Sequence, residues 1–190
     1  VTVKDKITVG KKVVKLNQAI KLWKLYKPIK YICSTKDEYN RKKVFDLIPK
    51  DFPRIISIGR LDFMSEGLLL LTNNGDIVNN VLRAEHKKEK EYIVTVNKKI
   101  SIEFVEKMRR GVRIMGRLTR KCYVKKIHEN SFKIILTQGL NRQIRRMCEV
   151  LGYRVTKLKR IRIMDIHLDT KIGEYRDLND DEVKQLFNQK

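Results

Sequence analysis

The sequence has little of several residue types, and each shortage excludes a class of protein. Its three cysteines are far apart in the 190 residues, so they form neither the disulfide framework of a small secreted protein nor a Cys-x-x-Cys metal pair. The three histidines are scattered without a ligand-like spacing. No apolar run approaches the roughly 18 residues of a membrane-spanning helix. We therefore expect reduced thiols, a cytoplasmic location, no metal and no membrane partner.

Acidic residues are also scarce relative to basic ones. There are 22 Asp and Glu against 44 Lys and Arg, which gives a net charge of +22 and a pI near 10.0. A folded protein tolerates such self-repulsion most readily if it works on a polyanion, and nucleic acid is a better candidate than a membrane surface. A hydrophobic content of 42% is ordinary for a globular chain of this length.

The centre of the sequence places an aspartate between two apolar runs. Asp62 follows the strand-like run Ile55–Ile58, and Gly67 opens a second run, Leu68–Leu71, which ends at a predicted turn over 73–75. A loop carboxylate between two buried strands combines rigid support with access, as a reactive group needs. The alternative is that Asp62 only caps the turn through its own side chain.

The remaining patterns predict an α+β fold with a largely antiparallel or mixed sheet flanked by short helices. Alternating or β-branched runs predict strands at 22–33, interrupted by Lys27-Pro28, and at 92–96, 112–127, 132–137 and 160–166. Helical spacing predicts short helices at 43–48, 76–82, 101–110, 141–151 and 179–187. In the strand over 160–166, Arg160 and Arg162 are expected on the face opposite Ile161 and Ile163.

Short polar residues mark the predicted helix starts. They are Asp76, Ser101, Asn141 and Asn179, the last forming a capping box with Glu182. Apolar residues then recur at helical spacing: Ile102, Val105 and Met108 in one helix, and Ile144, Met147, Cys148 and Leu151 in another. The second stripe leaves Arg142, Arg145 and Arg146 outside it.

Three ordered motifs resemble the bacterial rRNA pseudouridine synthases of the RsuA type. Gly59-Arg60-Leu61-Asp62 followed by Ser65 to Gly75 is similar to the catalytic motif of that family, and Lys90 to Val94 and Gly139 to Met147 match further motifs in the expected order. The resemblance runs from about Leu22 to the C-terminus and is closest to the large-subunit branch, RluB and RluF. It implies a pseudouridine synthase catalytic domain over 21–190. It also implies that 1–20 is the end of an S4-like RNA-binding module, with a basic, loosely ordered arm as the alternative.

The resemblance implies that Asp62, Tyr92 and Arg145 are catalytic. Pseudouridine formation needs a carboxylate close to the uridine but no cofactor or metal, and Asp62 would serve either as nucleophile or as base. Arg145 is expected to keep Asp62 ionised by gripping it through two hydrogen bonds. Tyr92 is expected to stack on a flipped-out uracil and to assist proton transfer at C5.

Basic residues around this centre predict phosphate contacts that position an RNA. The expected contacts are Arg60, Arg142, Arg146, Lys157, Arg160 and Arg162, of which Arg60 alternatively fills the space of the extruded base. The resemblance implies a monomeric enzyme that modifies one uridine in a folded loop or stem-loop of 23S rRNA. The alternative function is a non-catalytic RNA-binding or ribosome-assembly protein. A hydrolase using Asp62 and Glu66 as a carboxylate pair is a weaker third hypothesis.

Overall fold

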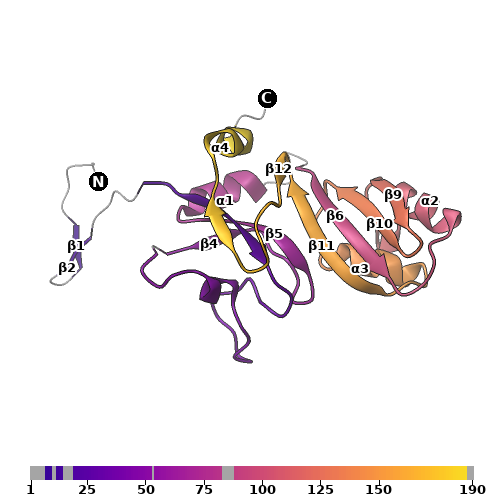
Figure 1. Cartoon of the computed structure of the whole chain (residues 1–190), viewed down its shortest axis with the longest axis horizontal. Coiled ribbons are helices and arrows are strands. Elements are labelled where there is room, and N and C mark those ends of the chain that lie inside the picture. Colours follow the sequence, from indigo (N-terminus) through magenta and orange to yellow (C-terminus); the bar gives the residue numbers. More distant parts are fainter. Residues whose placement is uncertain (1–6, 10–11, 15–18, 53, 83–87, 188–190) are drawn as a thin grey trace.

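The chain folds around one mixed sheet with short helices, which confirms the α+β prediction. We describe it from a computed structural model that covers residues 7–9, 12–14, 19–52, 54–82 and 88–187 (Figure 1). The nine-stranded sheet consists of β3 (Leu22–Lys27), β4 (Ile56–Ile58), β5 (Glu66–Thr72), β6 (Lys90–Val96), β9 (Tyr123–His128), β10 (Ser131–Leu136), β11 (Val155–Ile163), β12 (Ile166–His167) and β13 (Tyr175–Asp177). No helix in the described residues is long and apolar enough to cross a membrane.

The sheet order is β13-β3-β5-β11-β6-β10-β9, with β4 paired to β5 and β12 paired to β11. All these pairings are antiparallel except the one between β5 and β11. That parallel pairing is short, because it joins only Glu66 and Gly67 to Lys159 and Arg160. Further along β5 the same edge pairs with β4 instead. The two halves of the sheet therefore meet at the first residues of β5.

Strand β5 is buried on both faces, which explains its run of four leucines. Leu68 and Leu70 pack with Leu22 and Ile163 on one face, whereas Leu69 and Leu71 pack with Trp23 and Leu25 on the other. The face of Leu68 and Leu70 is covered by α1 (Gly75–Leu82) and α4 (Asp180–Phe187), and the opposite face by η1 (Val44–Leu47), a 3-10 helix. The loop that carries Asp62 thus leads into a strand with both faces packed.

The other half of the sheet has its own apolar core. Strands β6, β9, β10 and β11 pack against α2 (Ile102–Arg110) and α3 (Gln143–Val150), which lie together at that end of the molecule in Figure 1. Phe104 of α2 packs edge-on against Phe132 of β10, with ring centroids 5.3 Å apart. A small hairpin, β7 (Arg113–Ile114) and β8 (Arg117–Leu118), follows α2. Because this half supplies β6 and α3, its core positions Tyr92 and Arg145.

Two strands lie within 1–20. Strand β1 (Ile7–Val9) pairs antiparallel with β2 (Lys12–Val14) in a separate two-stranded sheet. The assignment of this segment to an S4-like module stays a prediction.

Two helix starts were predicted correctly. Ser101 Oγ accepts a hydrogen bond from the Phe104 amide, and Asn179 and Glu182 form the expected reciprocal capping box. Within the first of these helices, however, Ile102 is 82% exposed and Phe104 takes its predicted place in the core. Ile102 follows the cap directly, and the buried residues of the helix are Phe104, Val105 and Met108.

The other two predicted caps were wrong by one or two residues. Helix α1 begins at Gly75, and Asn74 Oδ1 accepts from the Asp76 amide, so Asn74 takes the role expected of Asp76. Helix α3 has Arg142, in a left-handed conformation with φ 50°, at the N-cap position predicted for Asn141. The Gln143 side chain folds back to accept from the Leu140 amide, which satisfies a donor without Asn141.

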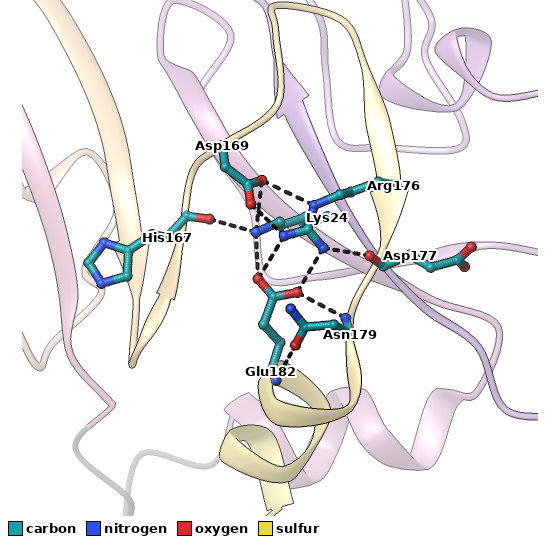
Figure 2. Close-up of polar contacts among 7 residues, drawn as sticks. All are labelled: Lys24, His167, Asp169, Arg176, Asp177, Asn179 and Glu182. Carbon is teal, nitrogen blue, oxygen red and sulfur yellow. Dashed lines mark hydrogen bonds and ion pairs between the residues drawn. The ribbon is translucent and has the colours of Figure 1, made fainter.

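An ion cluster around the buried Lys24 fastens the C-terminal elements to the sheet. We call the four residues Lys24, Asp169, Arg176 and Glu182 the C-terminal clasp (Figure 2). Lys24 Nζ lies 2.5 Å from Glu182 and 2.8 Å from Asp169, and also donates to the His167 carbonyl at 2.9 Å. Arg176 donates to both carboxylates as well. Lys24 comes from β3 and Glu182 from α4, so the clasp joins two elements that are far apart in the sequence.

Candidate active site

Asp62 lies where the sequence predicts it, on the connection from β4 to β5. The loop 59–65 leaves β4 through Gly59, whose φ of 77° suits glycine. The Asp62 side chain is 32% exposed, so a ligand can reach it from solvent. The flanking strands therefore supply the rigid support and access that the sequence suggested.

Every backbone carbonyl of the loop from Arg60 to Ser65 has a hydrogen-bond donor. Side chains bond most of them: Arg160 donates to the Arg60 carbonyl, the Cys33 thiol donates to the Leu61 carbonyl, and Arg145 donates to the Met64 carbonyl. Lys27 donates to the carbonyls of both Asp62 and Ser65. The Ser65 amide also donates to the Asp62 carbonyl, and the Lys30 amide donates to the Phe63 carbonyl. Three of these donors are cationic side chains. Such bonds are stronger than neutral ones, so they fix the loop and the direction of the Asp62 side chain.

Lys27 is one residue beside the site that sequence reasoning missed. It is fully buried, and its Nζ donates to the carbonyls of Pro28, Asp62 and Ser65 at 2.9, 3.1 and 2.7 Å. Burial lowers the pKa of Lys27 to about 8, although Cys33 and Asp62 oppose that shift. The available signal was a lysine inside an apolar strand directly before a proline, since a lysine is seldom buried without a polar partner.

Arg145 does reach Asp62, but not in the predicted geometry. Its Nε lies 4.0 Å from Asp62 Oδ2, which is too long for a hydrogen bond, and that Nε is buried with no hydrogen-bond partner among the described residues. The Nη atoms donate instead to the carbonyls of Met64 at 2.7 Å and Val155 at 3.3 Å. The two-hydrogen-bond grip predicted from the sequence was therefore wrong. Arg145 supports the loop and faces the carboxylate across a gap.

The position of Arg145 follows from the helix that carries it. Ile144, Met147 and Cys148 of α3 enter the core as predicted, yet Arg145 is also buried, with 8% exposure. Burial lowers the pKa of Arg145, the neighbouring Arg142 adds to the effect, and Asp62 opposes it. A guanidinium titrates so far above neutrality that it stays charged. Arg145 is thus a fixed positive charge behind the carboxylate.

Tyr92 and Asp62 line one cavity of about 590 Å³. Tyr92 lies on β6, directly across from Arg160 on β11 and from Ile134 on β10. The loop between β10 and α3 closes another side with residues that include Gln138, Leu140 and Arg142. The volume is within the range of small-molecule sites, so it accommodates a single nucleoside.

The cavity is strongly cationic. Its basic lining residues are Arg60, Lys88, Lys90, Arg120, Arg142 and Arg160, and Asp62 is the one carboxylate among its described lining residues. Burial lowers the pKa of Lys90, and Arg160 and Lys88 lower it further. Such a lining favours a ligand that carries negative charge close to the group that reaches Asp62. Lys88, Lys90 and Arg120 were not singled out from the sequence.

The predicted RNA-binding residues are divided between the cavity and other places. Arg60 and Arg142 line the cavity and are exposed, as phosphate contacts require. Lys157 is exposed on β11 outside the cavity lining, and Arg146 donates to the Asn141 carbonyl and side chain. For these four residues, RNA contact stays a prediction.

Arg160 and Arg162 are already engaged within the protein. Arg160 is 3% exposed and donates to the carbonyls of Leu68 and Arg60. Arg162 pairs with Glu89 and Glu91 at 2.9 and 2.7 Å. The register of β11 against β6 shifts between Arg160 and Arg162, so the predicted simple alternation with Ile161 and Ile163 was wrong. Arg160 thus supports the Asp62 loop, whereas Arg162 ties β11 to residues at the start of β6, and the role of both toward RNA stays a prediction.

Gly67 explains how Arg160 comes so close to the loop. A Cβ at this position would lie 2.2 Å from the Arg160 carbonyl oxygen, and the φ of Gly67 is 108°. Only glycine permits the parallel pairing of β5 with β11 at this point. The glycine that the sequence suggested as the opening of a strand therefore joins the two halves of the sheet beside Asp62.

Glu66 does not form a carboxylate pair with Asp62 in this structure. The Tyr26 hydroxyl donates to Glu66 Oε2 at 3.3 Å, and Glu66 is absent from the described cavity lining. Within the described part of the chain, no group of three or more His, Cys, Asp or Glu side chains is arranged to hold a metal ion. The cysteines are free thiols, and burial raises the pKa of Cys122 to about 11 and of Cys148 to about 12.

A loop carboxylate and an aromatic residue line one cationic cavity beside a buried arginine, and comparison with known sequences identifies the class of protein. The family described as RNA pseudouridylate synthase matches residues 21–150, and the chain belongs to that family. It is 52% identical over 164 residues to the dual-specificity RNA pseudouridine synthase RluF of Salmonella typhi, covering 86% of this chain and 56% of that protein. The RluF of Escherichia coli K12 is 51% identical over the same share of each chain. The chain thus spans little more than half the length of these relatives.

A longer match is found in Rickettsia typhi. An uncharacterized RNA pseudouridine synthase from that organism is 32% identical over 195 residues, covering 100% of this chain and 80% of the relative. Among solved structures, a pseudouridylate synthase superposes with a TM-score of 0.83 at 25% identity, covering 98% of this chain and 82% of the other. The archaeal Nop10-Cbf5 complex, at 18% identity and a TM-score of 0.55, shows a shared fold only.

Proposed function

We propose that this chain isomerises a specific uridine in RNA to pseudouridine, with Asp62 as the catalytic carboxylate. The observation that carries the proposal is the position of Asp62: the loop carbonyls from Arg60 to Ser65 are all hydrogen-bonded, and Asp62 lines the same cavity as Tyr92. The reaction breaks the bond from C1′ to N1, forms one from C1′ to C5, and replaces the hydrogen at C5 with one at N1. Atoms and electrons balance within the substrate, so no external reactant is required.

The contacts support a division of roles. Asp62 attacks the sugar or base, or removes a sugar proton, while Arg145 keeps a positive charge behind it. Tyr92 stacks on the flipped-out uracil, because its side chain lines the same cavity. The cationic lining receives the phosphates of the target nucleotide and its neighbours. Arg60, exposed two residues before Asp62, contacts a phosphate or fills the space of the extruded base.

We further propose a folded loop or stem-loop of 23S rRNA as the substrate and the cytoplasm as the place of action, with the protein acting as a monomer. The sequence resemblance to the large-subunit branch and the identity to RluF support this choice. The term dual-specificity in the name of those relatives supports testing more than one RNA. Residues 1–20 are proposed to end an S4-like RNA-binding module that strengthens RNA binding.

The test is tritium release from RNA labelled at uridine C5, with unmodified 23S rRNA as substrate and tRNA and 16S rRNA in parallel. We expect release by the parent chain and none above background by Asp62→Asn. Glu66→Gln serves as the matched carboxylate control and should retain activity. Thermal unfolding followed by circular dichroism checks that both variants are folded. Release by Asp62→Asn at the parental rate, or loss of release in a folded Glu66→Gln, contradicts the assignment. Tight RNA binding without release by the parent points to the non-catalytic alternative.

A further inference from the structure

Three side chains form a stack directly beside the loop that carries Asp62. The Arg41 guanidinium lies 5.0 Å from the ring centroid of Tyr39 and 5.8 Å from that of Phe63. We call Tyr39, Arg41 and Phe63 the aromatic stack. Phe63 is the residue after Asp62, so the stack reaches from the catalytic loop to the segment 34–42. None of its members lines the cavity.

The aromatic stack is held in place before any ligand arrives. Arg41 Nε donates to Asp37 Oδ1 at 3.0 Å, and the Arg41 amide donates to Asp37 Oδ2 at 2.6 Å. Asn40 adopts a left-handed conformation with φ 50°, which asparagine tolerates, and this turns the chain between Tyr39 and Arg41. The Phe63 carbonyl accepts from the Lys30 amide at 2.7 Å. Binding a ligand to the stack therefore requires little further loss of conformational entropy.

The charge of Arg41 is matched inside the protein. Asp37 lies against it with only 2% of its side chain exposed, and this contact lowers the pKa of Asp37. A guanidinium already engaged by a carboxylate is a poor phosphate ligand, so what the stack offers to a partner is a flat π surface. Tyr39 is the outer member and is 76% exposed. Met64, on the other side of Phe63 in the sequence, is 45% exposed.

We propose that the aromatic stack binds an unpaired nucleobase next to the target uridine in the RNA, which stacks on Tyr39. The inference rests on the proposed function, because that function brings RNA to Asp62. Its position favours a neighbouring nucleotide, since Phe63 follows the catalytic residue and lies outside the cavity that takes the uridine itself. Nearby lysines are exposed and suited to the adjoining phosphates: Lys36 and Lys42 on the segment 34–42, and Lys30, whose amide donates to the Phe63 carbonyl.

The experiment compares Tyr39→Ala with Tyr39→Phe, which keeps the ring. The exposed aromatic Phe187 on α4 provides the matched control, Phe187→Ala. The binding probe is hexauridylate with one 2-aminopurine, whose fluorescence is quenched on stacking. We expect Tyr39→Ala to lose the quenching and to bind roughly five- to a hundredfold more weakly, the range of one base–aromatic stack. Tyr39→Phe and Phe187→Ala should behave as the parent. On 23S rRNA, KM should rise in Tyr39→Ala while kcat is retained.

The outcomes separate this inference from the proposed function. Loss of quenching in Tyr39→Ala without tritium release by the parent would support the stack and contradict the isomerase assignment. Normal turnover with the quenching, binding and KM of Tyr39→Ala all equal to those of the parent would overturn the stack. A parent chain that binds the probe without quenching would overturn it as well. Equal thermal unfolding of parent and variants shows that the differences do not come from misfolding.

Discussion

The C-terminal clasp and the Asp62 site each bury a cation beside carboxylate groups, but they hold the charges at different distances. In the clasp, Lys24 lies 2.5 Å from Glu182 and 2.8 Å from Asp169, and Figure 2 shows Arg176 completing the cluster. At the site, Arg145 Nε remains 4.0 Å from Asp62. The Glu182 side chain is 12% exposed, whereas that of Asp62 is 32% exposed.

The difference follows from what else binds each cation. Lys24 directs its Nζ to the two carboxylates and one carbonyl, so the clasp neutralises its own charge. The Nη atoms of Arg145 donate hydrogen bonds to the carbonyls of Met64 and Val155, and these bonds hold the guanidinium away from Asp62. A fully paired cluster stabilises the fold, whereas an incompletely paired one leaves its carboxylate free to act on a ligand. Two groups that each contain a buried cation thus indicate opposite roles.

Breaking the clasp should have the largest effect on stability and none on chemistry. Glu182→Gln removes one charge from the cluster and leaves the buried Lys24 with half its carboxylate partners. We expect a loss of about 1 to 3 kcal/mol in the free energy of unfolding, less than for a fully uncompensated buried charge, because Asp169 still pairs with Lys24. Urea denaturation measures the loss, and kcat measured well below the melting temperature should be unchanged.

The control for Glu182→Gln lies on the same helix, α4. Asp181→Asn removes an exposed pair with Lys184 at 3.7 Å and should leave the urea midpoint nearly unaltered. Burial opposes ionisation of Glu182 and Asp169, but hydrogen bonds from Arg176 and Lys24 prevail and lower the pKa of both carboxyls. Their stabilisation is therefore present above their unfolded pKa values and is lost as the pH falls through the folded ones. If Glu182→Gln leaves the free energy of unfolding unchanged, the clasp does not stabilise the fold.

The second prediction concerns the gap at the site. Arg145→Lys keeps the charge but cannot reach both carbonyls, so the Asp62 loop should shift. We expect kcat to fall about a hundredfold, as for a misplacement of roughly 1 Å, with KM little changed. Single-turnover kinetics on labelled 23S rRNA measure the fall.

Arg109→Lys is the matched control for this variant. Arg109 Nε also donates to a backbone carbonyl, that of Val124 at 2.8 Å, but it lies on α2 outside the described lining of the Asp62 cavity. Arg109→Lys should lower the free energy of unfolding somewhat and leave kcat unchanged. If both variants lower kcat equally, Arg145 has no positioning role and only supports the fold.

The smallest expected effect on stability concerns Lys27. It is buried like Lys24, but its hydrogen-bond partners are all backbone carbonyls. Its pKa is lowered from 10.5 to about 8 by burial, so the folded protein releases this proton at lower pH than the unfolded chain. The unfolded state then binds more protons between these pH values, and the contribution of Lys27 to stability rises with pH. We expect a gain of about 1 to 2 kcal/mol between pH 7.5 and 9.5. Urea denaturation at both pH values measures it, and a titration of the Lys27 Cε resonance with a midpoint above pH 10 contradicts it.

Local patterns in the sequence determined much of the fold and the position of the catalytic candidate. The leucine run of β5, the Ser101 cap and the Asn179–Glu182 capping box involve residues within a few positions of one another, so spacing alone predicts them. The same holds for Asp62 on a loop between two strands. The order of three motifs was sufficient to place the chain in its family.

Tertiary structure decided which basic residues are buried and what they bind. Arg145 meets Met64 across 81 positions in the sequence and Arg160 meets Leu68 across 92, contacts that no helical or strand period encodes. In the sequence, Lys24 and Lys27 are typical of surface lysines in a strand. In the structure they are buried, because β13, α4 and the Asp62 loop cover them. The sequence by itself thus determined the elements and the carboxylate. The gap beside that carboxylate arose only when distant carbonyls took the donors of Arg145, because hydrogen-bond partners are set by proximity in space.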